Sequence, residues 1–125
     1  MTNILLIEDS ATLLAVGADA LRTLVRDGGR VKAFPGWVEA IPFIQWADLV
    51  VADWVLEGFN ADTCEDAIHR LIDMRKPFII WTANRNSVPP KFDEYIVGKD
   101  LSELTKAVKS AMRLQEPVTA NGADK

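Results

Sequence analysis

Five polar side chains follow apolar stretches of strand length. Glu8 and Asp9 follow "NILLI", Asp53 follows "DLVVA", Thr82 follows "PFIIW", and Lys99 follows "EYIV" after one glycine. Crowded carboxylates repel one another, and a hard cation such as Mg²⁺ relieves that repulsion. A carboxylate is also a nucleophile that forms an aspartyl-phosphate. If these residues meet, they indicate phosphoryl transfer onto Asp53, with Lys99 pairing with the phosphoryl group and Thr82 donating a hydrogen bond to it.

Each of these residues alone also fits an ordinary structural role. Glu8 and Asp9 suit the positive end of a helix dipole, and Asp53 suits a turn. Thr82 and Lys99 suit a backbone-bonded hydroxyl and a solvated surface charge. The chemistry therefore depends on the elements that would bring them together.

Those elements alternate between strand and helix along the chain. Strands are expected at 3–7, 30–34, 48–52, 77–81 and 94–97, and helices at 11–27, 37–45, 61–75 and from 101 onward. Alternation of this kind predicts a parallel sheet with helices on both faces. We expect the five-stranded, doubly wound, flavodoxin-like α/β fold of strand order 2-1-3-4-5. In such a sheet, ligands bind outside the carboxyl ends of the strands, where all five polar residues would lie.

Several helix details follow from spacing. Ser10 is expected to cap the first helix, and Gly28-Gly29 to stop it. Asp62 with Glu65, and Asp100 with Glu103, have capping-box spacing. Two apolar helix faces are predicted, formed by Cys64, Ile68, Leu71, Ile72 and Arg75, and by Leu101, Leu104, Val108 and Met112. Residues 83–90 are expected to form a loop or about one helical turn.

Bulk properties exclude several classes. The 125 residues fit one domain over 1–115, with 116–125 expected to be a disordered tail. A formal charge of −4 argues against nucleic acid, and no apolar run suits a membrane helix. Cys64 has no cysteine partner, which favours the cytoplasm, and His69 is expected on a helix surface.

The quoted pieces as a set resemble response-regulator receiver domains. "ILLIEDS", "LVVADW", "IIWTA" and "VGKD" look like the four landmark stretches of that family, over about residues 3–114. The resemblance implies a phosphoacceptor at Asp53, charged by a histidine kinase or phosphotransfer protein. It implies that Mg²⁺ is held by Glu8, Asp9, Asp53 and the backbone carbonyl of Val55. Thr82 resembles the switch hydroxyl, and Lys99 the phosphate-pairing lysine.

The chain departs from the family pattern in four places. Asp100 replaces the usual proline after the lysine, and Ile96 replaces the switch aromatic, with Tyr95 adjacent. The loop after Asp53 reads "LEGFN". Thr82 and Lys99 are separated by only 17 positions, so the fourth helix is expected to be short or missing. "KPFIIWTANRNSVPPKF" looks like a divergent form of the "PFxFATGY" subgroup, whose members work with HWE-class histidine kinases.

Three functions stay open at this point. The leading one is a single-domain response regulator, not an enzyme, that signals to an unknown downstream protein by contact or by phosphorelay. The second is a pseudo-receiver, a protein-binding module that needs no phosphate. The third, a phosphohydrolase, is the weakest, because Val55 stands where a second acid would be needed. The oligomeric state is not predicted.

Overall fold

The computed structural model describes residues 2–26, 28–54 and 61–115. They form one five-stranded parallel sheet of order β2-β1-β3-β4-β5, as predicted. The strands are β1 (Ile4–Ile7), β2 (Val31–Phe34), β3 (Leu49–Ala52), β4 (Phe78–Trp81) and β5 (Ile96–Val97). The helices are α1 (Ala11–Arg22), α2 (Trp37–Ala40), α3 (Ala61–Asp73) and α4 (Leu101–Gln115). Three 3₁₀ helices complete the order: η1 (Ile41–Phe43), η2 (Arg85–Ser87) and η3 (Pro90–Tyr95).

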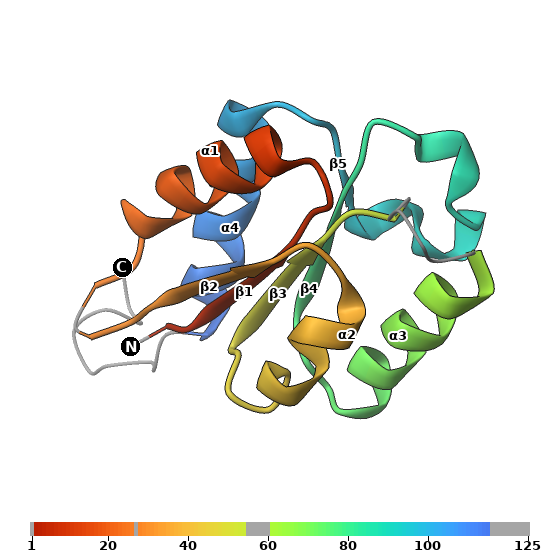
Figure 1. The fold of residues 1–125 in the computed structure, drawn as a ribbon, viewed down its shortest axis with the longest axis horizontal. Coiled ribbons are helices and arrows are strands. Elements are labelled where there is room, and N and C mark those ends of the chain that lie inside the picture. The colour runs from red at the N-terminus through yellow and green to blue at the C-terminus, as the bar shows by residue number, and fades with distance from the viewer. Residues whose placement is uncertain (1, 27, 55–60, 116–125) are drawn as a thin grey trace.

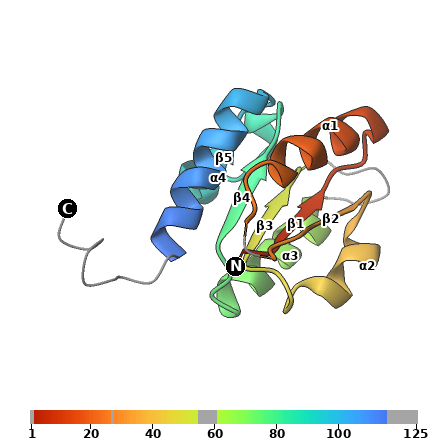
Figure 2. The ribbon, with the colours of Figure 1, turned by 90° about the vertical axis from the view of Figure 1, so that its left-hand side faces the viewer.

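The sheet separates two hydrophobic layers. Helices α1 and α4 cover one face, and α2 and α3 cover the other (Figures 1 and 2). Along β3, Leu49 and Val51 belong to the first layer, while Val50 and Ala52 belong to the second. A strand covered on both faces needs apolar residues at every position, which explains the unbroken runs in β1, β3 and β4. The edge strand β2 is only half-buried, and its sequence alternates accordingly.

The connection from β4 to β5 contains no α-helix. Two 3₁₀ helices, η2 and η3, take the place of the α-helix that the flavodoxin-like fold has between β4 and β5. The expectation that this helix is short or missing is therefore confirmed. Phe92 of η3 is buried and contacts the Trp54 ring, with ring centroids 5.9 Å apart. Lys91 Nζ also donates a hydrogen bond to Glu65 on α3, at 2.8 Å. The connection is therefore anchored to Trp54, beyond the end of β3, by one aromatic contact, and to α3 by one exposed ion pair.

The predicted first helix ends five residues too late, because α1 stops at Arg22 rather than near residue 27. The Thr23 hydroxyl donates to the Ala20 carbonyl and satisfies one of the last carbonyls of the helix. The glycines act further along. Gly28 has φ 86°, and a Cβ on Gly29 would lie 2.3 Å from the Thr2 carbonyl oxygen. They let the chain pass close to the N-terminal segment before β2.

Other boundary predictions were also wrong. Ile72 is exposed and Arg75, at φ 56°, lies beyond the end of α3, so neither belongs to its buried face. Since α3 begins at Ala61, Asp62 lies inside the helix and not at the position before its first residue. Residues 94 and 95 belong to η3, and the predicted strand shrinks to two residues because the Tyr95 ring stacks on Phe78 at 4.4 Å.

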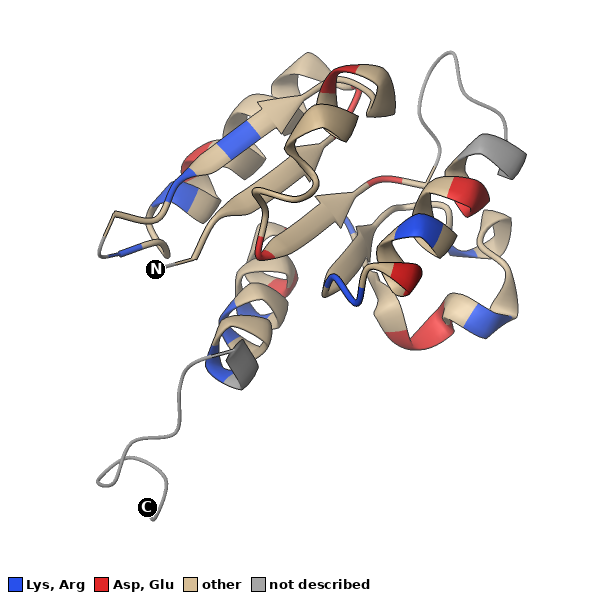
Figure 3. Ribbon diagram, turned by 90° about the horizontal axis from the view of Figure 1, so that it is seen from below, with Lys and Arg blue, Asp and Glu red and all other residues tan. Residues whose placement is uncertain are grey.

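Ser10 and Asp100 cap their helices as predicted, but the Asp100 N–H donates to the Gly98 carbonyl and not to Glu103, so the full capping box did not form. The Ser10 hydroxyl accepts a hydrogen bond from the Leu13 N–H, and the Asp100 carboxylate accepts one from the Ser102 N–H at 2.9 Å. On α4, Leu104 and Val108 are buried, whereas Leu101, predicted on the same face, is exposed. Basic residues line the outer side of this helix (Figure 3): Lys106, Lys109 and Arg113. Among the described residues, no helix has the length and hydropathy to cross a membrane.

Gly17 lies where the backbone of α1 comes close to the sheet. A Cβ at this position would lie 3.1 Å from the Trp81 ring and 3.2 Å from Leu6. We expect Gly17→Ala to lower the free energy of unfolding by about 1 kcal/mol, because overpacking costs ~1–3 kcal/mol and the gain in helix propensity is only ~1 kcal/mol. Urea denaturation measures this change. The loss should shrink in a Trp81→Phe background, and an Ala variant more stable than wild type would contradict the tight contact.

Candidate functional site

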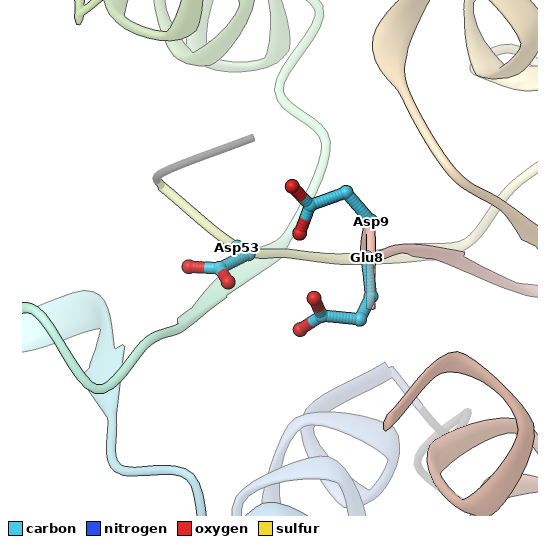
Figure 4. Close-up of side chains that lie close together, drawn as sticks. All are labelled: Glu8, Asp9 and Asp53. Carbon is cyan, nitrogen blue, oxygen red and sulfur yellow. The ribbon is translucent and has the colours of Figure 1, made fainter. Parts of the chain in front are cut away.

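The candidate site lies at the carboxyl-terminal edge of the sheet. Glu8 and Asp9 follow β1, and Asp53 follows β3, the strand beside it. One carboxylate oxygen from each residue lies within 4.8 Å of the others. Figure 4 shows the three side chains close together, with the carboxylates of Glu8 and Asp9 extending toward the side of Asp53. The convergence expected at this edge is therefore present for these three acids.

The parallel register places the acids. Ile7 pairs with Ala52, so the residues that follow them leave the sheet at the same level. The Asp53 N–H donates to the Ile7 carbonyl at 3.0 Å, and this bond extends the pairing by one step. The Glu8 N–H donates to the Phe34 carbonyl of β2 in the same way. The backbone of both acids is thus held by neighbouring strands.

Lys99 brings the compensating positive charge. Its ammonium lies 3.1 Å from Asp53 Oδ2 and also forms an ion pair with Glu8. The three side chains are sheltered from solvent, with exposed fractions of 13% for Lys99, 11% for Asp53 and 1% for Glu8. The same Glu8 carboxylate accepts the Ser10 N–H at 3.0 Å, so the helix start and the lysine share one acid.

Burial lowers the pKa of Lys99 to about 8. The two carboxylates beside it act in the opposite direction, because they stabilise the ammonium form. Lys99 therefore stays charged at neutral pH. It offsets part of the repulsion among the three acids.

Thr82 follows β4, the strand next to β3, and is 2% exposed. Its hydroxyl oxygen accepts the Asn84 N–H at 3.1 Å, and its own N–H donates to Val97 of β5. A hydroxyl has one donor and two acceptor positions, so the O–H can still donate to a ligand. Val55, whose carbonyl was predicted as a further metal ligand, lies outside the described residues.

Carboxylate oxygens at this separation suit a hard cation. Mg²⁺ takes oxygen ligands and is bound in proteins through one or two carboxylates plus phosphate oxygens. Glu8, Asp9 and Asp53 supply such oxygens, and the backbone of two of them is fixed by the sheet. The donor set fits Mg²⁺ and offers none of the softer nitrogen or sulfur ligands that favour zinc.

Two contacts at this site had no signal in the sequence. The Lys99 ammonium lies 4.3 Å from the centroid of the Trp81 ring, and the Cys64 thiol donates to the Trp54 carbonyl at 2.7 Å. Trp54 directly follows Asp53, so Cys64 anchors the chain just beyond the candidate nucleophile. Both contacts join residues that are distant in sequence, and neither pair forms a recognisable motif. His69 is exposed on α3, as predicted, and bonds to Glu65.

Solved structures similar to this chain include receiver domains of response regulators. The receiver domain of a Francisella response regulator gives a TM-score of 0.71 at 17% identity, over 93% of this chain and 100% of its own. The Erythrobacter litoralis PhyR receiver domain gives 0.70 at 25% identity, covering 95% of each chain. Thermotoga maritima TrrA, solved with Mg²⁺ and BeF, gives 0.71 at 20% identity, over 89% and 99%.

Sequence comparison adds nothing to this result, since no family model and no curated protein matches the chain. The structural similarity nonetheless spans nearly the whole of each neighbour. It agrees with the observed strand order and with the position of the acidic cluster at the carboxyl ends of the strands. The chain has the fold of response-regulator receiver domains.

Proposed function

We propose that this protein is a single-domain response regulator of two-component signalling that accepts a phosphoryl group on Asp53. The observation that carries the proposal is the placement of the Lys99 ammonium between Asp53 and Glu8, beside the three-carboxylate cluster. An acidic cluster alone is common. An acidic cluster with a sheltered lysine on the central carboxylate is suited to a doubly charged phosphoryl group, whose oxygens need cations.

The reaction assigns a separate role to each residue. An Asp53 oxygen attacks the phosphorus, a P–O bond forms, and the P–N bond to a donor imidazole breaks with its electron pair staying on nitrogen. Lys99 already contacts Asp53 and pairs with an oxygen of the arriving group. The Thr82 hydroxyl donates to another oxygen. Burial of Glu8 and Thr82 excludes water from one side of the site.

Glu8, Asp9 and Asp53 would hold Mg²⁺, and the bound cation would supply positive charge that neutralises the phosphoryl oxygens. Its ligands must be deprotonated, and Lys99 favours that state in Glu8 and Asp53. The lysine and the cation would thus act on the same acids. TrrA was solved with Mg²⁺ and BeF, which supports the same pairing of cation and phosphoryl-like group for this chain.

The partners follow from the same proposal. The donor is a histidine kinase or a phosphotransfer protein, and "KPFIIWTANRNSVPPKF" supports a kinase of the HWE class. The output is contact with a downstream protein or onward transfer of the phosphoryl group. We propose no turnover of a separate substrate, so the protein is a signalling phosphoacceptor and not an enzyme.

A second candidate, a pseudo-receiver that binds partners without phosphate, is favoured by one observation. Ile96 stands where the family has a switch aromatic, and the neighbouring Tyr95 ring is stacked on Phe78. An aromatic held in that stack is not free to follow Thr82. The acidic cluster with Lys99 favours the first candidate, and the following two measurements separate them.

The first measurement uses tryptophan fluorescence. Trp54 follows Asp53 and Trp81 contacts Lys99, so both indoles report on the site. We expect a beryllofluoride analogue to change the emission in the presence of Mg²⁺, and Asp53→Asn to abolish this response because the anion loses its carboxylate. Asp93→Asn, an exposed acid of η3, is the matched control and should respond like wild type. Equal responses from wild type and Asp53→Asn would rule out the phosphoacceptor.

The second measurement concerns the metal alone. Binding to the folded state should stabilise the protein by about 1.4 kcal/mol when free Mg²⁺ is ten times its Kd. Thermal melts at increasing Mg²⁺ concentration measure the gain. Asp9→Ala should remove most of it, because one of the three ligands is lost, whereas Glu94→Ala on exposed η3 should keep it. A wild-type melting temperature independent of millimolar Mg²⁺ would contradict the metal site.

A further inference from the structure

The face of the Trp81 ring lies against the Lys99 ammonium. The distance from Nζ to the ring centroid is 4.3 Å, within the range of a cation–π contact. Trp81 is fully buried and the Lys99 side chain is 13% exposed. Because such contacts strengthen when both groups are removed from water, this one belongs to the stronger kind. Tryptophan is also the aromatic residue with the strongest attraction for a cation.

The ring itself is held firmly in place. Trp81 pairs with Val97 of β5, and the chain reaches Lys99 only two residues later. On the other side, Gly17 of α1 brings its backbone so close that a Cβ would lie 3.1 Å from the ring. Leu104 and Val108 of α4 belong to the same buried layer. The ring therefore offers the ammonium a rigid surface built by β4, β5 and α1.

We propose that Trp81 is a positioning residue for Lys99, holding its ammonium at the acidic edge of the sheet so that it meets a phosphoryl group on Asp53. The inference rests on the proposed function and deepens it. A lysine side chain has a flexible four-carbon stem, and fixing its rotatable bonds costs conformational entropy. A ring that restricts the ammonium beforehand lowers the entropy lost when the anion arrives.

The Trp81 ring can also keep its contact while the Lys99 ammonium changes from one anionic partner to another. Lys99 pairs with two carboxylates before the reaction and must pair with a phosphoryl oxygen afterwards. The attraction of the ring for the cation does not depend on which anion lies opposite. The ammonium can exchange one anion for another while it keeps the contact with Trp81. A leucine at this position would keep an apolar, though smaller, side chain in the core without this attraction.

The test compares three variants by the affinity for beryllofluoride at saturating Mg²⁺, measured by calorimetry so that the loss of a tryptophan does not affect the signal. We expect Trp81→Leu to weaken binding about tenfold and Trp81→Phe, which keeps an aromatic face, about threefold. Ile79→Ala is the control. It removes packing from the same face of β4, two residues away, and should bind within about twofold of wild type.

The outcomes separate positioning from packing. Wild-type affinity in Trp81→Leu, or an equal loss in Ile79→Ala, would overturn the inference. If Trp81→Leu fails to fold, the loss in Trp81→Phe relative to Ile79→Ala decides the question. Failure of wild type to bind the analogue would instead refute the proposed function.

A second readout needs no phosphoryl analogue. Acetylation of Lys99 by acetic anhydride is followed by peptide mass spectrometry, with the exposed Lys106 as internal reference. Release of the ammonium from the ring should speed the Lys99 reaction several-fold in Trp81→Leu compared with Ile79→Ala. Equal rates in these two variants would show that the ring does not hold Lys99, whatever the analogue binds.

Discussion

The ammonium of Lys99 between Glu8 and Asp53 is the interaction on which the acidic edge depends. Three carboxylates within 4.8 Å of one another are costly to keep ionised, and the cost rises as they are sheltered from water. One positive charge among them offsets part of that cost. A buried ion pair seldom adds net stability, because both partners lose hydration. The ion pairs of Lys99 are therefore better explained by the proposed binding of a phosphoryl group than by a gain in folding stability.

The sheet order is what makes this meeting possible. Glu8 and Lys99 are separated by 91 positions, and they meet because β1, β3, β4 and β5 end at the same edge. Unbroken apolar runs made the three central strands predictable, since only strands covered on both faces need them. The convergence of three acids and a lysine followed from the parallel order. The Asp100 cap was predictable too, because it depends only on residues two positions apart.

What could not be predicted depends on contacts between distant residues. The end of α1 is decided by the Thr23 hydroxyl, while the glycines expected to stop it serve the approach to the N-terminal segment. The stack of Tyr95 on Phe78 shortens β5, and no local pattern in "EYIV" predicts that stack. Trp81 reads as an ordinary core residue of a buried strand. Its contact with Lys99 appears only when β4 and β5 pair and Gly17 brings α1 close to the ring.

The shortness of β5 has a consequence for how the protein behaves at high concentration. An edge strand offers unpaired N–H and C=O groups, onto which a strand from another chain can add. With only Ile96 and Val97 in the ladder, this side of the sheet gives a second molecule almost no template. The 3₁₀ turns of η3 precede the strand, and the Asp100 cap starts α4 soon after it. The connection of 3₁₀ turns that leads from β4 into this short strand thus protects one side of the sheet against edge-to-edge aggregation.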